Sequence, residues 1–331
     1  MTAKAPVGGK RPFRMVAGVS KLGDLADGLG ALGLLMAAGG KWYYCDPTSG
    51  TGSGDSPENA TPSLLDAYNL CRDGYNDGVI FIGGATAYKP TAAFTWSKSY
   101  CHLIGVTNGL PGMGQRARIV NDAANDLSVL FTLSGSGCLI QNIQFFDGKD
   151  SAADGACVLV SGSRNHLVNC FIAGMGDATA SGPFSRAGSY SLSVTGSENT
   201  VSGGTIGLDT VARTAANSEL IVSGARNRFV GCEIRSNSTT SGKFLVKIDS
   251  SGGDLRDVQF EDVLFFNYSS NWATGITDAI NMSITNTAYV ILRGNCQFVG
   301  VGMGVADTVT RVYGAGAAPN AGMFVSTQPT T

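Results

Sequence analysis

From residue 41 onward, hydrophobic residues alternate with polar ones in short runs that Gly, Ser, Asn and Asp interrupt. A period of two residues is typical of β-strands, and the interrupting residues are typical of tight turns. One stretch departs from this pattern: Thr61 can act as an N-cap with Pro62 at the first helical position, and apolar residues then recur at helical spacing up to Cys71. The pattern therefore predicts a β-rich chain with one short helix near residues 62–73, which would cover the open edge of the first strands.

An internal repeat is the strongest feature of the sequence. Residues 160–172, 194–206 and 222–234 align without gaps, and each segment contains a strand end, a Gly, an Asn and a second strand. Weaker copies extend the series. One apolar residue anchors each copy, and these anchors are Phe145, Ile172, Ile206, Ile234, Phe260 and Phe298. They lie 27, 34, 28, 26 and 38 residues apart. A constant strand motif with variable spacing is typical of stacked coils whose insertions lie in loops on one side.

These observations predict an all-β chain in which residues 41–300 form a right-handed parallel β-helix of about eight to ten coils. Residues 1–40 lack a steady period and contain many Gly residues, so we expect them to form an extended N-terminal arm. Residues 301–331 would form a C-terminal tail or a final coil.

The repeat assigns a structural role to its Asn residues. Asn165, Asn199 and Asn227 stand between two strands that must bend sharply, and Asn tolerates the left-handed conformation that such a bend requires. Stacked in register, their amides could bond one to the next along the helix axis. The alternation also places Cys170 and Cys232 in one inward column, two coils apart. At about 4.8 Å per coil their separation is about 9–10 Å, which is too wide for a disulfide.

Composition and charge exclude several function classes. The net charge of −2 offers no general attraction for nucleic acid or an anionic membrane, and no apolar run reaches the ~18 residues of a membrane span. The eight cysteines form no CxxC pair, and only His102 and His166 could assist them, so we expect free thiols in the core and no zinc site. The Gly-rich stretches match no nucleotide-binding motif, and we therefore expect no cofactor.

One pair of carboxylates could carry glycoside hydrolysis. In the repeat register, Glu233 and Glu261 face outward one coil apart, which would separate them by about 7–8 Å and fit an inverting mechanism. Arg235 would lie opposite Glu261, and a surface salt bridge is the alternative that the pattern favours.

A second group of carboxylates lies in a loop between two copies of the repeat. Asp147, Asp150 and Asp154 could form a weak calcium site, and a solvated acidic loop is the alternative. His102 and His166 have no Ser or Cys nucleophile that the sequence identifies, and His166 occupies the position of Thr200 and Arg228 in the other repeats.

Motifs outside the repeat carry a resemblance to a known family. They are Tyr43-Tyr44-Cys45-Asp46-Pro47, Val79-Ile80-Phe81-Ile82-Gly83, Thr95-Trp96-Ser97 and Gln115-Arg116-Ala117-Arg118-Ile119. With them, residues 41–300 resemble the pectate-lyase-like β-helix proteins encoded by tailed phages. That family includes virion structural proteins as well as depolymerases, and this chain lacks both the paired Asp residues of polygalacturonases and the Arg and calcium-binding acids of the lyases.

The resemblance implies a non-enzymatic structural protein of the phage virion, most consistent with a capsid decoration or cement protein. The N-terminal arm would fasten it to the capsid, through the basic and apolar residues Lys10, Arg11, Phe13, Arg14 and Met15; a solvated tail is the alternative. The resemblance also implies a homotrimer. The alternative function is that of a tail spike that binds or cleaves carbohydrate.

Overall fold

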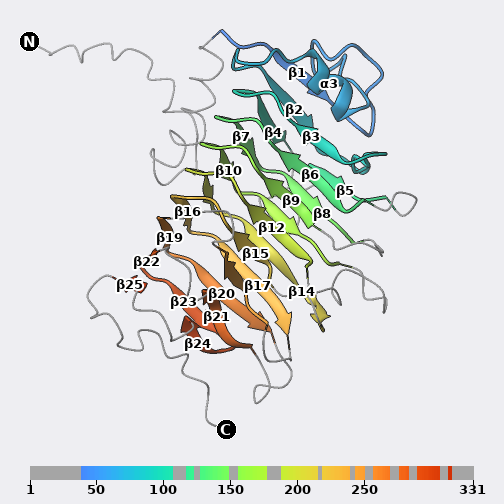
Figure 1. Cartoon of the computed structure of the whole chain (residues 1–331). Helices are drawn as coiled ribbons and strands as arrows, with labels where there is room; N and C mark the ends of the chain where they lie inside the picture. Colours follow the sequence, from blue (N-terminus) through green and yellow to red (C-terminus); the bar gives the residue numbers. More distant parts are fainter. Residues whose placement is uncertain are drawn as a thin grey trace, which may run out of the picture.

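The computed structural model describes residues 39–106, 117–122, 127–148, 156–176, 188–214, 218–238, 243–249, 256–268, 276–282, 289–305 and 312–314. Over these ranges the chain is almost entirely β-structure, arranged as three parallel sheets that the chain visits in turn. One turn of the chain runs through β9 (Ala156–Val160), β10 (His166–Val168) and β11 (Phe171–Ala173), one strand in each sheet. This path defines a right-handed parallel β-helix, as the repeat predicted (Figure 1).

The first sheet, sheet A, has ten strands. In spatial order they are β1 (Trp42–Cys45), β2 (Gly78–Ile82), β4 (His102–Val106), β7 (Leu139–Gln141), β10, β13 (Thr200–Ser202), β16 (Asn227–Val230), β19 (Asp257–Glu261), β22 (Tyr289–Arg293) and β25 (Val312–Gly314).

Sheets B and C complete each coil, with seven and eight strands. Sheet B consists of β5 (Arg118–Val120), β8 (Gln144–Phe146), β11, β14 (Thr205–Arg213), β17 (Glu233–Ser238), β20 (Leu264–Tyr268) and β23 (Gln297–Val299). Sheet C consists of β3 (Phe94–Trp96), β6 (Val129–Leu133), β9, β12 (Tyr190–Val194), β15 (Leu220–Val222), β18 (Val246–Ile248), β21 (Ile276–Met282) and β24 (Val301–Val305).

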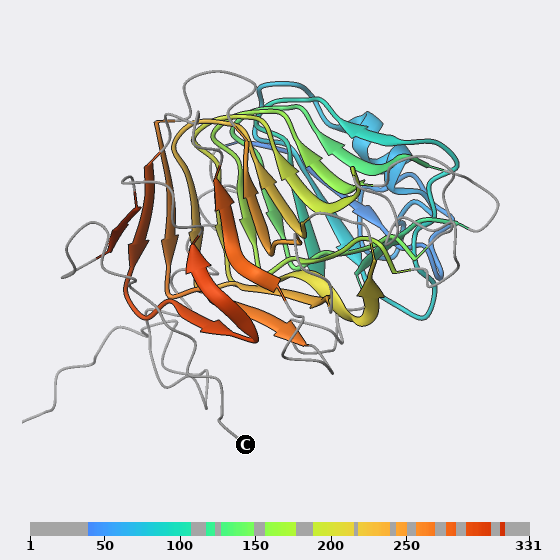
Figure 2. The same cartoon turned by 60° about the horizontal axis from the view of Figure 1, so that its bottom comes forward.

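The sheets surround the space between the stacked strands in Figure 2, and the side chains that point into this space form one continuous core. Inward columns contain aliphatic and aromatic side chains, because alternate residues of each strand point to the same side. The largest buried side chains include Trp96, Phe131, Phe145, Phe229 and Phe265. All eight cysteines are buried and free, which confirms their interpretation as small core residues.

The register of sheet B confirms five of the six anchors and corrects one. Ile172 pairs with Phe145 on one side and with Ile206 on the other, and Ile206 pairs with Ile234. The partner of Ile234 in the next coil is Phe265, not Phe260. The sixth anchor, Phe298, pairs with Phe265 and was also placed correctly.

The misplaced anchor belongs to another sheet. Phe260 lies in sheet A, where it pairs with Phe229. The segments that contain Phe260 and Phe265 are two consecutive alternating runs, separated only by the bend that joins sheet A to sheet B, so either run fits the weak copy of the repeat.

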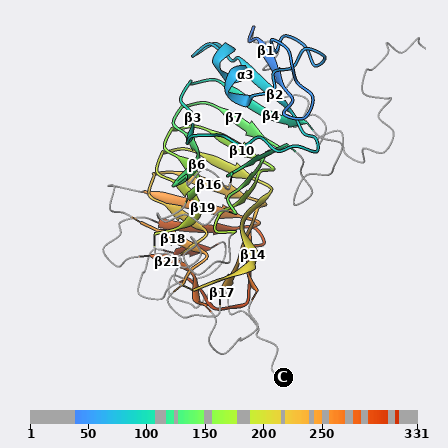
Figure 3. The ribbon, with the colours of Figure 1, turned by 90° about the vertical axis from the view of Figure 1, so that its right-hand side faces the viewer.

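The N-terminal end of the helix is covered by α3 (Leu64–Leu70), which lies beside β1 and β2 (Figure 3). Its N-cap is Ser63, whose Oγ accepts the Asp66 N–H at 3.4 Å, and not Thr61 as the sequence suggested. Thr61 is unavailable as a cap because it forms a parallel bridge with Cys45. At the other end of α3, Lys98 Nζ donates to three carbonyls, those of Tyr68, Asn69 and Cys71.

Candidate functional site

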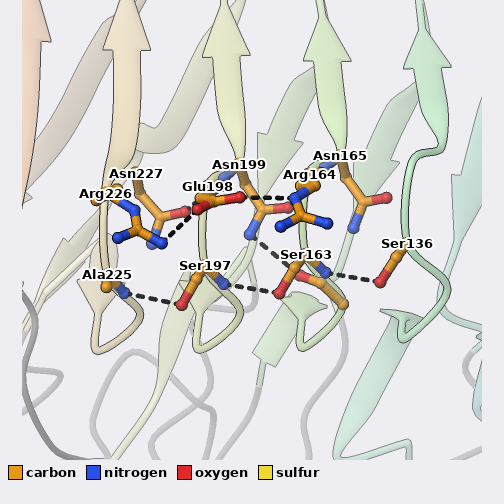
Figure 4. A network of polar contacts seen from close by, with 11 residues as sticks. Ser136, Ser163, Arg164, Asn165, Ser197, Glu198, Asn199, Ala225, Arg226 and Asn227 are labelled. Atoms are coloured by element: carbon orange, nitrogen blue, oxygen red, sulfur yellow. Dashed lines mark hydrogen bonds and ion pairs between the residues drawn. The ribbon is translucent and has the colours of Figure 1, made fainter.

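The turn that leads from sheet C into sheet A contains the Asn residues of the repeat, in one buried column (Figure 4). Asn165 Oδ1 accepts the backbone N–H of Cys138 at 2.8 Å, Asn199 Oδ1 accepts that of Asn165 at 2.9 Å, and Asn227 Oδ1 accepts that of Asn199 at 2.8 Å. Each amide nitrogen donates to a glycine carbonyl of the preceding coil, at 2.9, 3.1 and 2.9 Å. The amides therefore bond to the main chain of the neighbouring coil and not to one another.

The left-handed conformation lies one residue earlier than the sequence suggested. Arg164, Glu198 and Arg226 have φ values of 59°, 61° and 56°, and each directly precedes an Asn of the column. In this geometry the Asn side chain turns inward to the neighbouring coil, and the preceding side chain projects outward from the bend. An ion-pair row results.

In that row Glu198 bridges two coils. Its Oε2 accepts from Arg164 Nε at 2.6 Å, and its Oε1 pairs with Arg226 (Figure 4). The hydrogen bonds from Arg164 and then from Arg226 hold the pKa of Glu198 below its usual value. A parallel row of serines runs beside it, in which Ser197 N–H donates to Ser163 Oγ at 3.1 Å and Ala225 N–H donates to Ser197 Oγ at 3.2 Å.

The Asn column continues toward the N-terminus through residues that the repeat did not identify. The residues directly before β7, β4 and β2 are Cys138, Cys101 and Asp77, in register with Asn165. Asp77 acts like the Asn residues, because its Oδ1 accepts the backbone N–H of Lys41 in the preceding coil at 2.7 Å. The sequence signal was a polar residue before a strand, but the segment around Asp77 was too different from the repeat to be aligned.

Asp77 also binds Arg72, which fixes the segment that follows α3. Arg72 Nε donates to Asp77 Oδ2 at 2.9 Å, and Arg72 Nη2 donates to Oδ1 at 2.8 Å. Burial favours the neutral acid and raises the pKa of Asp77, but the bonds from Arg72 and from the backbone N–H groups outweigh burial, so the pKa lies below its ordinary value. Asp77 is therefore charged and fully engaged at neutral pH.

The predicted carboxylate pair does not form. Glu233 begins β17 in sheet B, whereas Glu261 ends β19 in sheet A, so the two residues lie on different sheets. Arg235 is not opposite Glu261; it pairs in register with Phe266. Each carboxylate has its own arginine, Glu233 with Arg235 at 2.7 Å and Glu261 with Arg228. The misplaced register of Phe260 caused the error.

A different acidic pair lies on the outer face of sheet B. Arg235 binds Glu233 through Nη2 and Asp209 Oδ2 through Nη1, at 2.7 and 3.3 Å. The Arg235 guanidinium lies 6.0 Å from the centre of the Phe266 ring. Asp209 was missed because it lies in the extension of β14, which the other repeats do not share. The arrangement places two carboxylates and an aromatic ring around one cation.

A buried ion pair lies at the end of β14. Arg213 Nε donates to Glu219 Oε1 at 2.8 Å, and both side chains are no more than 2% exposed. Glu219 also accepts from Ser191 Oγ at 2.6 Å and from Ser236 Oγ at 3.0 Å, while Arg213 donates to the carbonyl of Met175 at 2.8 Å. The network joins three successive coils and contains no side chain that is open to a substrate.

The histidines occupy one outward column of sheet A. His102 is in register with Leu139, and Leu139 with His166. His166 also pairs with Thr200, as the repeat predicted, and its Nε2 lies 2.7 Å from Ser202 Oγ. His102 is buried, its Nδ1 accepts the Leu139 N–H at 3.0 Å, and burial lowers its pKa to about 4.

The acidic loop is only partly within the described residues. Asp147 is 1% exposed, and its Oδ1 accepts from Asn121 Nδ2 at 3.1 Å, so it is not the solvated group that the sequence suggested. Asp150 and Asp154 lie outside the described residues, as do Lys10, Arg11, Phe13, Arg14 and Met15 of the arm. In the described part of the chain, no three His, Cys, Asp or Glu side chains are grouped as a metal site would require. No helix in these ranges has the length and apolar character of a membrane span.

The strand order and register show the fold: the chain is a right-handed parallel β-helix. Solved structures with this fold include pectin methylesterase PemA from Erwinia chrysanthemi, with a TM-score of 0.54 and 13% identity over 83% of this chain and 90% of that one. A pectin methylesterase variant in complex with hexasaccharide IV matches with a TM-score of 0.53 and 13% identity over 84% and 91% of the two chains. Geobacillus virus E2 ORF18 matches with a TM-score of 0.47 and 16% identity over 91% and 62%.

At such identities the similarity shows the fold alone. No protein-family model matches the chain, and no curated protein matches it at a significant level.

Proposed function

We propose that this protein is a non-enzymatic structural component of a phage particle, most consistent with a capsid decoration or cement protein attached through residues 1–40. The observation that carries the proposal is the use of polar side chains in the described residues. The Asn column, the serine row and the Glu198 ion pairs all bind neighbouring coils, so these groups stabilise a rod and are not arranged around a substrate.

The resemblance of residues 41–300 to β-helix proteins of tailed phages supplies the virion context. The carboxylates that could have cut a glycosidic bond are each held by an arginine, in two different sheets.

The attachment role is tested by deleting residues 1–40. The truncated protein should keep its circular dichroism spectrum and lose binding to particles that lack the protein, whereas the full chain binds them. Normal binding by the truncated protein would exclude the arm as the anchor. Sedimentation of the full chain tests the trimer separately.

The second candidate is a carbohydrate-binding or carbohydrate-cleaving spike. It is favoured by Asp209, Glu233 and Arg235 beside Phe266 on the outer face of sheet B. Paired carboxylates that flank the scissile bond are the usual catalytic groups of glycoside hydrolases. The pectin methylesterase structures show that this fold can bind an oligosaccharide in another protein.

Incubation with host polysaccharide separates the two candidates. The structural proposal expects no depolymerisation by the wild type. If activity is found, Asp209→Asn and Glu233→Gln should abolish it under the spike hypothesis, while Glu261→Gln in sheet A serves as the matched control. Activity that depends on Asp209 would overturn the structural proposal.

A further inference from the structure

The segment that follows the capping helix α3 lies beside the segment that leads into β4. Lys98 Nζ donates to the carbonyl of Cys71 at 2.7 Å. The Ser99 N–H donates to Asp73 Oδ1 at 2.7 Å, and the Gly74 N–H donates to the carbonyl of Ser99 at 2.9 Å. Three successive bonds therefore hold the two segments against each other.

This arrangement brings two cysteines together. Cys71 is the C-cap of α3 and is 4% exposed. Cys101 directly precedes β4 and is fully buried, and its carbonyl accepts the Trp96 Nε1–H at 3.0 Å. The side chains of Cys101 and Cys71 are hydrogen-bonded, and this bond, followed by burial, raises the pKa of the Cys101 thiol. The main chain is fixed at both cysteines, and their thiols are in contact.

Cys138 is the competing partner for Cys101. It directly precedes β7 and is in register with Cys101 in the neighbouring coil. Its thiol is engaged elsewhere, because Cys138 Sγ donates to the carbonyl of Lys98 at 3.3 Å. The hydrogen bond of the Cys101 thiol goes to Cys71 instead. The directions of the side chains therefore favour a pair of Cys71 and Cys101.

We propose that Cys71 and Cys101 are a redox-sensitive pair, which a small-molecule disulfide such as oxidised glutathione converts into a disulfide bond. The bond joins the end of α3 to the start of β4 and so locks the cap onto the β-helix. The locked form would persist in an oxidising medium, such as that outside a cell. The pair stands on its own geometry and does not depend on the proposed attachment to a particle.

The reaction consists of two exchanges. Cys101 does not start it, because its thiol is fully buried and its pKa is raised. Cys71 loses its proton, and its sulfur attacks one sulfur of oxidised glutathione, so that the disulfide breaks and one glutathione leaves as a thiolate. Cys101 then loses its proton, its sulfur attacks the Cys71 sulfur, and the second glutathione leaves. The two protons go to the two glutathione thiolates, so two protein thiols are oxidised and one disulfide is reduced to two thiols.

Access to Cys71 requires the last turn of α3 to open. Lys98 Nζ closes that turn by binding the carbonyls of Tyr68, Asn69 and Cys71, so Lys98→Met should speed up the oxidation. Once formed, the bond closes the loop from Cys71 to Cys101 and limits the freedom of the opened cap. Amide hydrogen exchange in α3 should therefore slow by at least about tenfold.

The test is peptide mapping after incubation of the full chain with oxidised glutathione at pH 8. The remaining thiols are blocked with N-ethylmaleimide under denaturing conditions before digestion. Trypsin separates the three cysteines into different peptides, which are 42–72 for Cys71, 99–116 for Cys101 and 119–149 for Cys138. We expect the first two peptides to be joined, with fragment ions that place the bond at Cys71 and not at Cys45. Dithiothreitol should separate them and restore the faster exchange in α3.

Three variants identify the two sulfur atoms and their order of reaction. Cys138→Ala should form the same bond, because Cys138 is not part of the pair. Cys101→Ala should stop at a mixed disulfide, with glutathione on Cys71. Cys71→Ala should leave Cys101 unmodified and the exchange of α3 unchanged by glutathione.

Three outcomes would overturn the proposal. The first is a bond between Cys101 and Cys138. The second is glutathione on Cys101 in the Cys71→Ala variant. The third is the absence of a bond between Cys71 and Cys101 in both the wild type and the Lys98→Met variant.

Discussion

The Asn column offers the sharpest test of how this helix is stabilised. Asn199 is 2% exposed, and its side chain makes two bonds to a neighbouring coil: Oδ1 accepts from the Asn165 N–H at 2.9 Å, and Nδ2 donates to the Gly162 carbonyl at 3.1 Å. The Asn199→Ala change removes both bonds and leaves a buried donor and a buried acceptor unpaired. Each such group costs roughly 1–3 kcal/mol, so the free energy of unfolding should fall by about 2–6 kcal/mol.

A matched control lies two residues away in the same turn. Ser197 Oγ accepts the N–H of Ala225 at 3.2 Å, and the site is partly exposed, so water can replace the hydroxyl. The position that follows Ser197 in this row is Ala225 itself, which shows that the turn accommodates a methyl group there. Ser197→Ala should therefore cost only about 0.5–1.5 kcal/mol.

Urea denaturation followed by far-ultraviolet circular dichroism measures both changes. The slope of the free energy of unfolding against urea concentration should be the same for the wild type and the two variants. Equal losses for Asn199→Ala and Ser197→Ala would refute the argument that buried amides hold the coils together.

Replacing Asn199 with Asp adds a pH dependence of known sign. The new carboxyl keeps the acceptor for the Asn165 N–H but faces the Gly162 carbonyl with a second oxygen. Burial and that oxygen disfavour the charged form, so the folded-state pKa should lie above the unfolded value of about 3.9. Relative to wild type, the stability of this variant should thus be highest below about pH 4 and fall as the pH rises through the folded-state pKa. Asp77 differs because Arg72 compensates its charge. A pH-independent difference from wild type would contradict this reasoning.

Three further predictions concern the core and the capping helix. Arg213→Met should lower the free energy of unfolding by roughly 3–5 kcal/mol, because it strands the buried Glu219 charge, and the double variant with Glu219→Leu should recover part of that loss in the same denaturation assay. Cys170 and Cys232 should remain unreactive toward a disulfide reagent at pH 8 in the native state and react on denaturation, because burial raises the pKa of each thiol to about 12; mass spectrometry that found a bond between them would overturn the register. Lys98→Met should increase hydrogen exchange in α3 without affecting later coils, because Lys98 Nζ binds the carbonyls at its C-terminal end; unchanged exchange would show that this cap is dispensable.

The sequence by itself determined the fold, because the repeat fixes pairing wherever it aligns without gaps. Ile172, Ile206 and Ile234 are equivalent in three copies, and a shift of one residue would turn each of them to solvent. The same alignment brought Asn165, Asn199 and Asn227 to equivalent positions. In this region the local sequence pattern and the stacking of the coils favour the same strand register, so the pattern was sufficient to predict the register.

Only the tertiary structure decided which strand belongs to which sheet where the repeat weakens. The runs ending at Phe260 and around Phe265 have the same alternation, and what separates them is the bend at Asp262, where φ is 54°. Hydrophobic alternation reports that a strand has one buried face but does not report which sheet it joins. The candidate pair of Glu233 and Glu261 depended on that assignment and was lost with it.

The buried pair of Arg213 and Glu219 was equally beyond the sequence. The two residues are six positions apart, a separation that predicts no contact in a strand or a helix, and they meet because the extension of β14 returns to the start of the next sheet C strand. A charge is buried only where a partner and several hydrogen bonds converge on it from other coils. That convergence is a property of the stacked structure, and no local pattern of residues encodes it.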